Sequence, residues 1–207
     1  MASTMRFDTW ENPTATKSVT MDQIAGGSAL VPIVPTSATV GSGTYSISTS
    51  GVVTFAGATS VSIDGAFSSA YNRYKVVINA NIVTTERWLE LRLRSGGSNI
   101  TTNNYAYTVR RFENSGTAAT DNSAQSSALF SIAGPTVGGQ TFAFDINNAF
   151  TPTVTNWFGQ SETVFSAGTF NMAVFGGMFT GTTSMTGFSI TPQAENITGT
   201  IQVYGYR

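Results

Sequence analysis

Basic and aromatic residues gather in one part of the chain. Five of its ten Lys and Arg residues fall between positions 87 and 111, namely Arg87, Arg92, Arg94, Arg110 and Arg111. Trp88, Tyr105 and Tyr107 lie among them, and a basic patch with interleaved aromatic side chains is one pattern that binds nucleic acid. If the two segments that carry these residues pair as strands, Arg92 and Arg94 lie near Arg110 and form a patch on one sheet face.

Acidic residues interleave with this basic cluster. Glu86, Glu90 and Glu113 lie within or next to the same range, and opposite charges on neighbouring strands stabilise a sheet by about 0.2–1 kcal/mol per pair. We therefore favour a solvated, salt-bridged sheet face over a nucleic-acid site. In a symmetric assembly this face would serve as an inter-subunit or ligand face, made by Trp88, Glu90, Arg92, Arg94, Arg110 and Arg111.

Catalytic chemistry has few candidates in this sequence. The chain contains no His and no Cys, so the most common general base, thiol nucleophiles and thiolate metal sites are missing. A glycosidase needs two carboxyl groups about 5–9.5 Å apart, but spacing favours no pair among Asp64, Glu86, Glu90, Glu113, Asp121, Asp145, Glu162 and Glu195. Asp121 and Asn122 offer oxygen ligands, yet their surroundings lack the spacing of a calcium loop. We expect neither enzyme activity nor a metal or other cofactor.

The elements that position these residues are short strands. In WLELRLRSGG, residues 88–97, Leu89, Leu91 and Leu93 alternate with charged residues, which predicts a strand with leucines in the core and Glu90, Arg92 and Arg94 outside. From residue 36 onward, about ten such runs are separated by Gly, Asn and Ser clusters. The pattern predicts an all-β fold, an antiparallel β-sandwich of jelly-roll type. The polar residues 114–127 are expected to form an exposed loop through which an adhesin would bind glycans.

For two aromatic clusters, the sequence allows a place in the core, in a subunit interface or in a ligand site. Residues 163–179 are rich in Phe and Met, with Phe165, Phe170, Phe175, Phe179, Met172 and Met178. Such residues fit a core or a subunit interface better than a ligand pocket. Trp157 and Phe158 allow the same alternatives. Because exposed aromatic rings of this kind stack on sugars, carbohydrate binding is one option.

The composition narrows the choice of partners. Only 10% of residues are charged and the net charge is −1, whereas about 25% are charged in typical globular domains. Because the net charge is close to zero, the chain has no strong overall electrostatic field. We therefore expect neither nucleic acid nor an anionic membrane as partner. The N-terminal MASTMRFDTWENP is too charged for a signal peptide, and no apolar run reaches the roughly 20 residues of a membrane span. We therefore expect no membrane insertion.

The first 35 residues differ from the rest of the chain. They show no sustained periodicity and contain a Gly26-Gly27 pair, yet they are more apolar than a flexible linker. We therefore divide the chain into an extended N-terminal attachment segment, residues 1–35, and a β-sandwich domain, residues 36–207. The apolar residues of the segment need a surface to bury against: Phe7, Trp10, Leu30, Val31, Ile33 and Val34.

Both ends of the chain and much of its body show a family resemblance. The opening MRFDTWENPTATKSVTMDQIAGG resembles the short N-terminal segments of tailed-bacteriophage fibre and adhesion proteins. The body GTYSISTSGVVTFAGATSVSIDGAFSSAYNRYKVVINA, the strand WLELRLRSGG and the ending GTIQVYGYR resemble β-sandwich domains of phage tails, fibres and head decorations. The resemblance covers most of the chain and carries over no catalytic residue.

This resemblance implies a structural component of a phage particle. It favours the tail or fibre apparatus, with a role in binding host-surface glycans. The alternatives are a head-decoration or head-fibre protein on the capsid and, third, an enzyme that degrades surface polysaccharide. The implied partners are other virion proteins, bound through the N-terminal segment, and further copies of the chain, with a homotrimer favoured. The implied location is the virion, after synthesis in the host cytoplasm.

Overall fold

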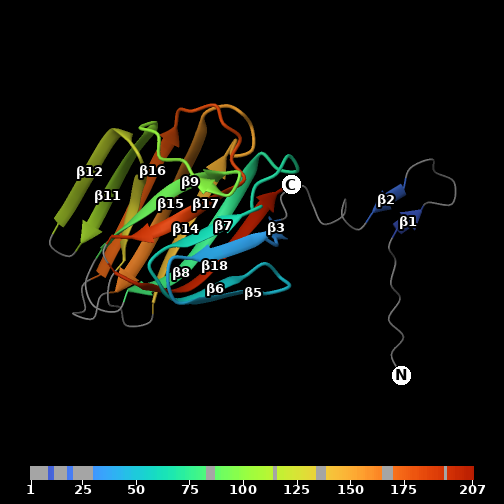
Figure 1. The fold of residues 1–207 in the computed structure, drawn as a ribbon. Helices are drawn as coiled ribbons and strands as arrows, with labels where there is room; N and C mark the ends of the chain where they lie inside the picture. The colour runs from blue at the N-terminus through green and yellow to red at the C-terminus, as the bar shows by residue number, and fades with distance from the viewer. Residues whose placement is uncertain are drawn as a thin grey trace, which may run out of the picture.

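The fold is a sandwich of two β-sheets. The computed structural model describes residues 9–11, 18–20, 30–82, 87–113, 116–133, 139–164, 170–193 and 195–207. Within this part of the chain, two antiparallel sheets pack face to face, and a separate pair of short strands precedes them (Figure 1). The predicted all-β sandwich is therefore confirmed. The described residues include no helix long and apolar enough to cross a bilayer.

The larger sheet has 10 strands, and β12 and β5 lie at its two ends. Its order begins with β12 (Gly116–Gln125), β11 (Tyr105–Glu113), β16 (Phe170–Phe179), β15 (Thr155–Val164) and β14 (Gln140–Asn147). It continues with β8 (Arg73–Ile82), β18 (Ile197–Tyr206), β6 (Val53–Ala58) and β5 (Thr44–Ile47), while β3 (Leu30–Ile33) also pairs with β18. β5 and β6 form an antiparallel hairpin around Thr49, Ser50 and Gly51.

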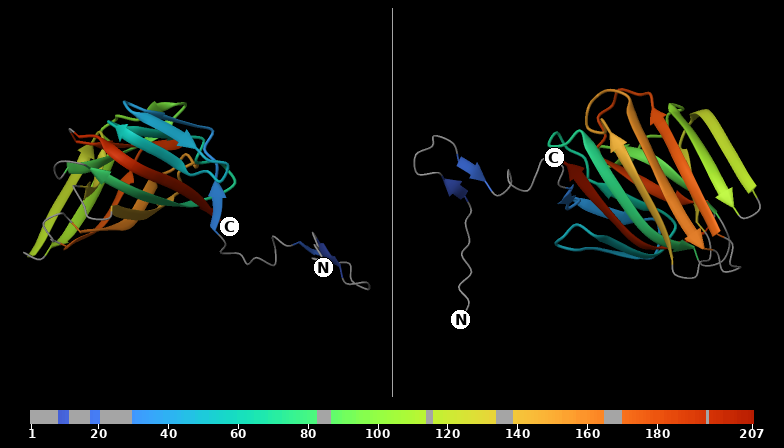
Figure 2. Two further views of the ribbon diagram at one scale, coloured as in Figure 1. Left: turned by 90° about the horizontal axis from the view of Figure 1, so that it is seen from below. Right: turned by 180° about the vertical axis from the view of Figure 1, so that it is seen from behind.

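The smaller sheet has 6 strands and covers part of one face of the larger sheet. Its order is β10 (Ser98–Asn99), β9 (Arg87–Ser95), β17 (Gly187–Pro192), β7 (Val61–Asp64) and β4 (Ser37–Val40), and β13 (Ala128–Ala133) also pairs with β9. The chain crosses between the sheets repeatedly, for example from β6 to β7 to β8 to β9, as a jelly roll requires. Figure 2 shows β11 and β12 extending beyond the smaller sheet.

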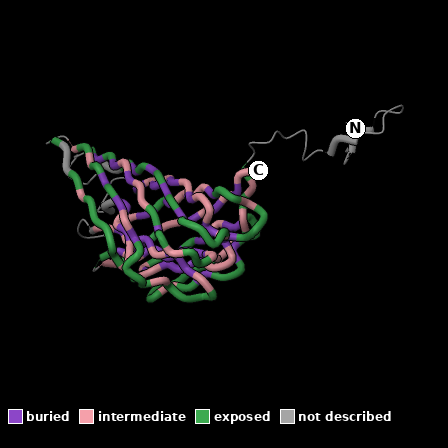
Figure 3. Tube along the Cα trace, turned by 90° about the horizontal axis from the view of Figure 1, so that it is seen from above, coloured by how far each residue is buried: buried purple, intermediate pink, exposed green. Residues whose placement is uncertain are grey.

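The buried residues lie between the two sheets (Figure 3). Many of them are aromatic. Phe130 of β13 packs against Phe142, Phe144 and Phe175 of the larger sheet, with ring centroids 5.7, 5.7 and 5.5 Å away. From the smaller sheet, β9 contributes the three leucines of WLELRLRSGG, which are fully buried as predicted: Leu89, Leu91 and Leu93. The alternation of period two thus identifies the buried side of β9 correctly.

One tyrosine crosses this core to join the two sheets. The phenol of Tyr105 on β11 donates to the carbonyl of Ile100 at 3.0 Å and accepts the N–H of Leu93 at 3.0 Å. Burial raises the pKa of Tyr105 to about 12, so the phenol stays protonated and able to donate. The bond to Leu93 ties β9 of the smaller sheet to β11 of the larger one.

The sandwich begins before residue 36. Leu30–Ile33 form β3, which pairs with Val203–Tyr206 of β18, so these residues belong to the larger sheet and not to an extended arm. Further towards the N-terminus, β1 (Thr9–Glu11) pairs with β2 (Ser18–Thr20). The predicted irregular segment therefore contains a short antiparallel strand pair.

Candidate functional site

The charged residues predicted to share one face lie on different sheets. Glu90, Arg92 and Arg94 are on β9 of the smaller sheet, whereas Arg110 and Arg111 are on β11 of the larger sheet. Among the described strands, β9 pairs with β10, β13 and β17, and β11 pairs with β12 and β16. The predicted patch that joins Arg92 and Arg94 to Arg110 is therefore wrong. Although β9 and β11 are close in sequence, the chain crosses to the other sheet between them.

Arg94 is buried on the outer face of the smaller sheet and not exposed as predicted. Its guanidinium donates to both carboxylate oxygens of Asp64 at 3.0 Å, to Oγ of Ser62 at 3.2 Å and to Oδ1 of Asn99 at 2.7 Å. A further bond reaches the carbonyl of Gly97. An arginine has five N–H donors, and these contacts use all of them. Arg94 therefore links β9 to β7 across the intervening strand β17 and has no donor left for a ligand.

The other charged residues of β9 also have partners within the chain. Arg92 bonds Glu90 at 2.9 Å and approaches the carbonyl of Ser126 at 3.4 Å. Gln193 donates a second bond to Glu90 at 3.0 Å. This part of the outer face is therefore a salt-bridged sheet surface.

The two arginines of β11 point to opposite sides of the larger sheet. Arg111 pairs with Glu113, and its guanidinium carbon lies 5.8 Å from the centre of the Trp88 ring. Arg110 instead bonds both carboxylate oxygens of Asp121 on β12, at 2.7 and 2.9 Å. The six residues predicted to form one contact face are thus divided among four local ion-pair groups.

The residues predicted to attach the chain to a partner are only partly described. Phe7 and the side chain of Trp10 lie outside the described residues. Leu30, Val31 and Ile33 form part of β3, and Val34 follows it with 52% of its surface exposed. Their attachment role stays a prediction.

The outer face of the larger sheet, which the smaller sheet does not cover, carries an exposed aromatic ring. Trp157 and Phe158 are neighbours on β15, yet Trp157 is 2% exposed and Phe158 is 65% exposed. Trp157 packs against β16, where a Cβ on Gly177 would lie 2.4 Å from its ring. Phe158 points the other way, with its ring edge beside Gly176. Of the two aromatic residues, only Phe158 is therefore accessible to a ligand.

Shallow hollows lie on the two sides of Phe158 across the strands. One, of about 600 Å³, lies over β12, β11 and β16 and is lined mainly by small and polar residues with one Met: Ala106, Tyr107, Thr108, Asp121, Asn122, Ser123, Gly176, Gly177 and Met178. The other, of about 200 Å³, lies over β8, β14 and β15 and includes Phe158 itself, with Lys75, Asp145 and Gln160. The strand register places Asp121, Thr108, Gly176, Phe158, Asp145 and Lys75 in one row across the sheet.

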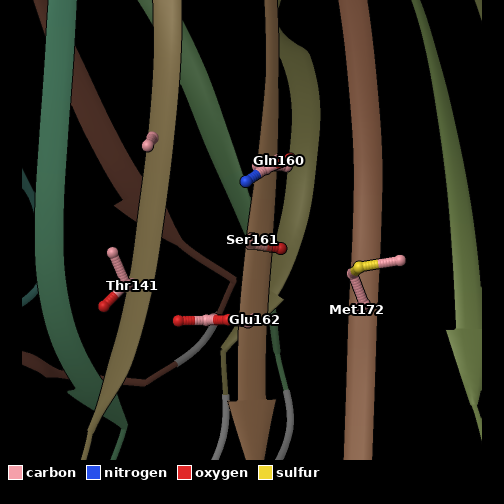
Figure 4. Close-up of a pocket in the computed structure, with 6 residues that line it drawn as sticks. Thr141, Gln160, Ser161, Glu162 and Met172 are labelled. Carbon is pink, nitrogen blue, oxygen red and sulfur yellow. The ribbon is translucent and has the colours of Figure 1, made fainter.

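A further hollow of about 90 Å³ lies one row away (Figure 4). The figure shows Thr141 of β14, Gln160 and Glu162 of β15, and Met172 of β16 around it. Since Gln160 borders this hollow and the one beside Phe158, its amide offers a donor and an acceptor next to the exposed ring.

Both acidic groups in the row beside Phe158 are already paired. Partial burial acts to raise the pKa of Asp145, but hydrogen bonds from Arg73 and Tyr206 and the nearby Lys75 outweigh it, so the pKa is lowered. Tyr206 donates to Asp145 at 2.8 Å, and Lys75 lies 3.3 Å away. Hydrogen bonds from Arg110 and Thr108 likewise lower the pKa of Asp121. Both carboxylates are therefore ionised acceptors at neutral pH.

This face combines groups that can stack and form hydrogen bonds. It carries the exposed aromatic rings of Phe112, Phe158 and Phe170, together with amides, hydroxyls and compensated charges. The described residues hold no group of three or more His, Cys, Asp and Glu side chains that would suit a metal ion.

The sequence of β15 carries a signal for this face. Asn156, Phe158, Gln160 and Glu162 alternate along β15 with buried or small residues. Because alternate side chains of a strand share one face, the three polar residues mark Phe158 as outward-facing. The contributions of Asp145 and Lys75 follow only from the order of strands.

Comparisons with solved structures give distant similarities, including the two described next. No family model matches the chain, and no curated protein matches its sequence. Domain 4 of AbnA, an extracellular GH43 arabinanase from Geobacillus stearothermophilus solved with arabinotriose, is 12% identical over 82% of each chain, with a TM-score of 0.32. The CBM2 module of the evolved Dit protein of Lactobacillus casei BL23 phage J-1 is 10% identical over 80% of this chain and 81% of the other, with a TM-score of 0.26. Scores this low carry no conclusion about function.

Proposed function

We propose that the outer face of the larger sheet binds carbohydrate, with Phe158 as the stacking platform. The observation that carries this proposal is the 65% exposure of Phe158 between two hollows lined by polar groups. An aromatic face packs against the apolar C–H face of a sugar ring. Gln160 on one side and Thr108 on the other would exchange hydrogen bonds with the sugar hydroxyls.

The charges of this face favour a neutral glycan. Three basic and three acidic side chains project from its described residues: Arg73, Lys75, Arg110, Asp121, Asp145 and Glu162. Asp121 and Asp145 are tied to basic partners, so little net charge is available to select an acidic sugar. Specificity would come from hydrogen bonds and the shapes of the hollows.

We propose binding without cleavage. A glycosidase needs a carboxylic acid whose pKa is raised so that it can protonate the leaving group. The pKa values of Asp121 and Asp145 are both lowered by their donors, which is the opposite of that requirement. These carboxylates suit hydrogen-bond acceptors better than general acids.

The setting that we propose for this binding is a phage virion, in the tail or fibre apparatus. The support is the resemblance of the N-terminal segment to those of phage fibre and adhesion proteins, and of the body to β-sandwich domains of phage tails, fibres and head decorations. Other virion proteins would hold the N-terminal segment, and the sheet face would meet glycans of the host surface.

The proposal is tested by screening the full chain on an array of neutral and acidic oligosaccharides. We expect neutral glycans to bind, and the best of them is then titrated against Phe158→Ala by calorimetry. Loss of the stacking ring should weaken binding by about tenfold, equivalent to about 1.4 kcal/mol.

The matched control is Phe112→Ala. Phe112 is also an exposed phenylalanine of the larger sheet, with 43% of its surface exposed, but its neighbours across the strands are Met172 and Thr117. It should bind like the wild type. Absence of any glycan binding by the wild-type chain, or equal loss in both variants, would contradict the proposal.

A further inference from the structure

The edges of the two sheets differ in length. β5, β4 and β3 have 4 residues each, β10 has 2 and β13 has 6. β12 has 10 residues and ends the larger sheet on the other side from β5. Short edge strands are one way in which proteins prevent pairing with another chain. With 10 residues, β12 is longer than the other edge strands.

β12 also lacks proline and lysine, two other common protections of edge strands. Its sequence GTAATDNSAQ contains no Pro and no Lys, and among the described strands it pairs with β11 alone. Its residues Asp121 to Gln125 are exposed, and Figure 3 shows this end of the sheet as a largely exposed strand. A bulge interrupts the register with β11 after Asn122, and Ala124 has a φ of 54° there. The regular stretch is therefore Gly116–Asn122.

We infer that this stretch pairs with the same stretch of a second copy of the chain. Two copies of one strand pair antiparallel about a twofold axis, and each supplies main-chain donors and acceptors to the other. The middle residue of the regular stretch is Ala119, which is exposed. A register centred there places Asp121 opposite Thr117 of the second copy, so the two aspartates do not face each other.

Charge favours a second copy as the occupant. Asp121 is the one charged residue of β12, and Arg110 of the same chain neutralises it through two hydrogen bonds at 2.7 and 2.9 Å. Two such edges therefore meet without repulsion. A strongly charged peptide would find no complementary charge here.

The pairing has a consequence for the exposed face, although it does not depend on carbohydrate binding. The two larger sheets would continue into one another, and Phe158 lies three strands in from β12 in each copy. Seven strand spacings of about 4.8 Å would separate the two rings by about 34 Å. Both rings would be on one continuous sheet, which suits a surface that carries many copies of a ligand.

The mass of the full chain in solution tests this inference. Light scattering after size exclusion should give the mass of two chains. Ala119→Lys places like charges opposite each other at the axis and should raise the dimer dissociation constant by about tenfold or more. The matched control is Ser46→Lys, which adds the same charge to β5, the other edge of this sheet, and should leave the mass unchanged. A wild-type monomer, or an assembly that Ala119→Lys does not weaken, would overturn the inference.

Cysteine cross-linking locates the interface. The chain has no Cys, so Ala119→Cys introduces one thiol per chain, and opposite side chains of an antiparallel pair are close enough for oxidation to link them. We expect a disulfide-linked dimer from Ala119→Cys and none from Ser46→Cys. Equal cross-linking of both variants, or a cross-linked species within a trimer, would count against β12 pairing. Glycan binding by the monomeric Ala119→Lys variant is measured separately, so the two proposals can fail independently.

Discussion

The outer faces of the two sheets carry polar side chains for different purposes. On the smaller sheet, Arg94 uses all its donors on Asp64, Ser62, Asn99 and Gly97, and the face is closed to ligands by its own hydrogen bonds. On the larger sheet, ion pairs lie on either side of Phe158 but leave its ring exposed. The concentration of charge in the sequence therefore marks a structural network, whereas the face that we propose as a binding surface presents an aromatic ring that no other element covers.

The largest expected difference in stability is between variants of Trp157, whose ring is buried, and of Phe158, whose ring is exposed. Trp157→Ala removes a ring that is 2% exposed and should lower the free energy of unfolding by about 3–5 kcal/mol, because the cavity cannot fully collapse. Urea denaturation followed by tryptophan fluorescence or circular dichroism measures the change.

Phe158→Ala is the matched variant for stability. Because its ring is mostly in solvent, we expect a change within about 0.5 kcal/mol, together with the loss of glycan affinity described above. A large loss of stability in Phe158→Ala would mean that the ring is a packing element, and the contrast between the two residues would disappear.

The next effect concerns the closed face of the smaller sheet. Arg94→Met removes the partner of Asp64, whose side chain is 17% exposed, and leaves a poorly solvated carboxylate. Breaking such a pair should cost about 3 kcal/mol, at the lower end for buried pairs because some water reaches both groups. Thermal and urea unfolding of the purified chain give the value.

Arg92→Met is the control on the same strand. Arg92 pairs with Glu90, and its side chain is 24% exposed, so the expected loss is at most about 1 kcal/mol. Glycan affinity should be unchanged in both variants once folded protein is compared. Equal destabilisation would show that the five bonds of Arg94 are not what distinguishes it.

The sequence was sufficient for the strand pattern but not for the order of strands. The alternation of Leu89, Leu91 and Leu93 predicts their burial, and it is correct. The same alternation is satisfied whether β9 pairs with β11 or lies across the core from it. The joining residues 96–104 hold no signal that distinguishes a hairpin from a crossing, so the patch of Arg92, Arg94 and Arg110 was predicted wrongly.

The predicted loop at residues 114–127 failed for a different reason. Its residues are polar at nearly every position, which is typical of loops, yet Gly116–Gln125 form β12. β12 extends beyond the smaller sheet, so neither of its faces needs apolar residues. β12 is a strand because its backbone forms hydrogen bonds with β11. Backbone pairing of this kind does not require alternating hydrophobic residues, so the sequence did not indicate it.

The smallest expected effect is the difference in pH dependence between two carboxylates in the row of Phe158: Asp145 on the neighbouring strand and Asp121 on β12. The folded-state pKa of Asp145 is lowered, so its contribution to stability is complete above the ordinary aspartate pKa of about 3.9 and is lost as the pH falls towards the folded value. The unfolding free energy of Asp145→Asn should therefore fall less steeply than that of the wild type between about pH 5 and pH 2. Asp121→Asn should change this slope less, since its side chain is 58% exposed, against 18% for Asp145, and water screens its ion pair. Denaturation curves at several pH values measure the slopes, and identical slopes for the wild type and Asp145→Asn would show that Arg73, Lys75 and Tyr206 do not hold this carboxylate.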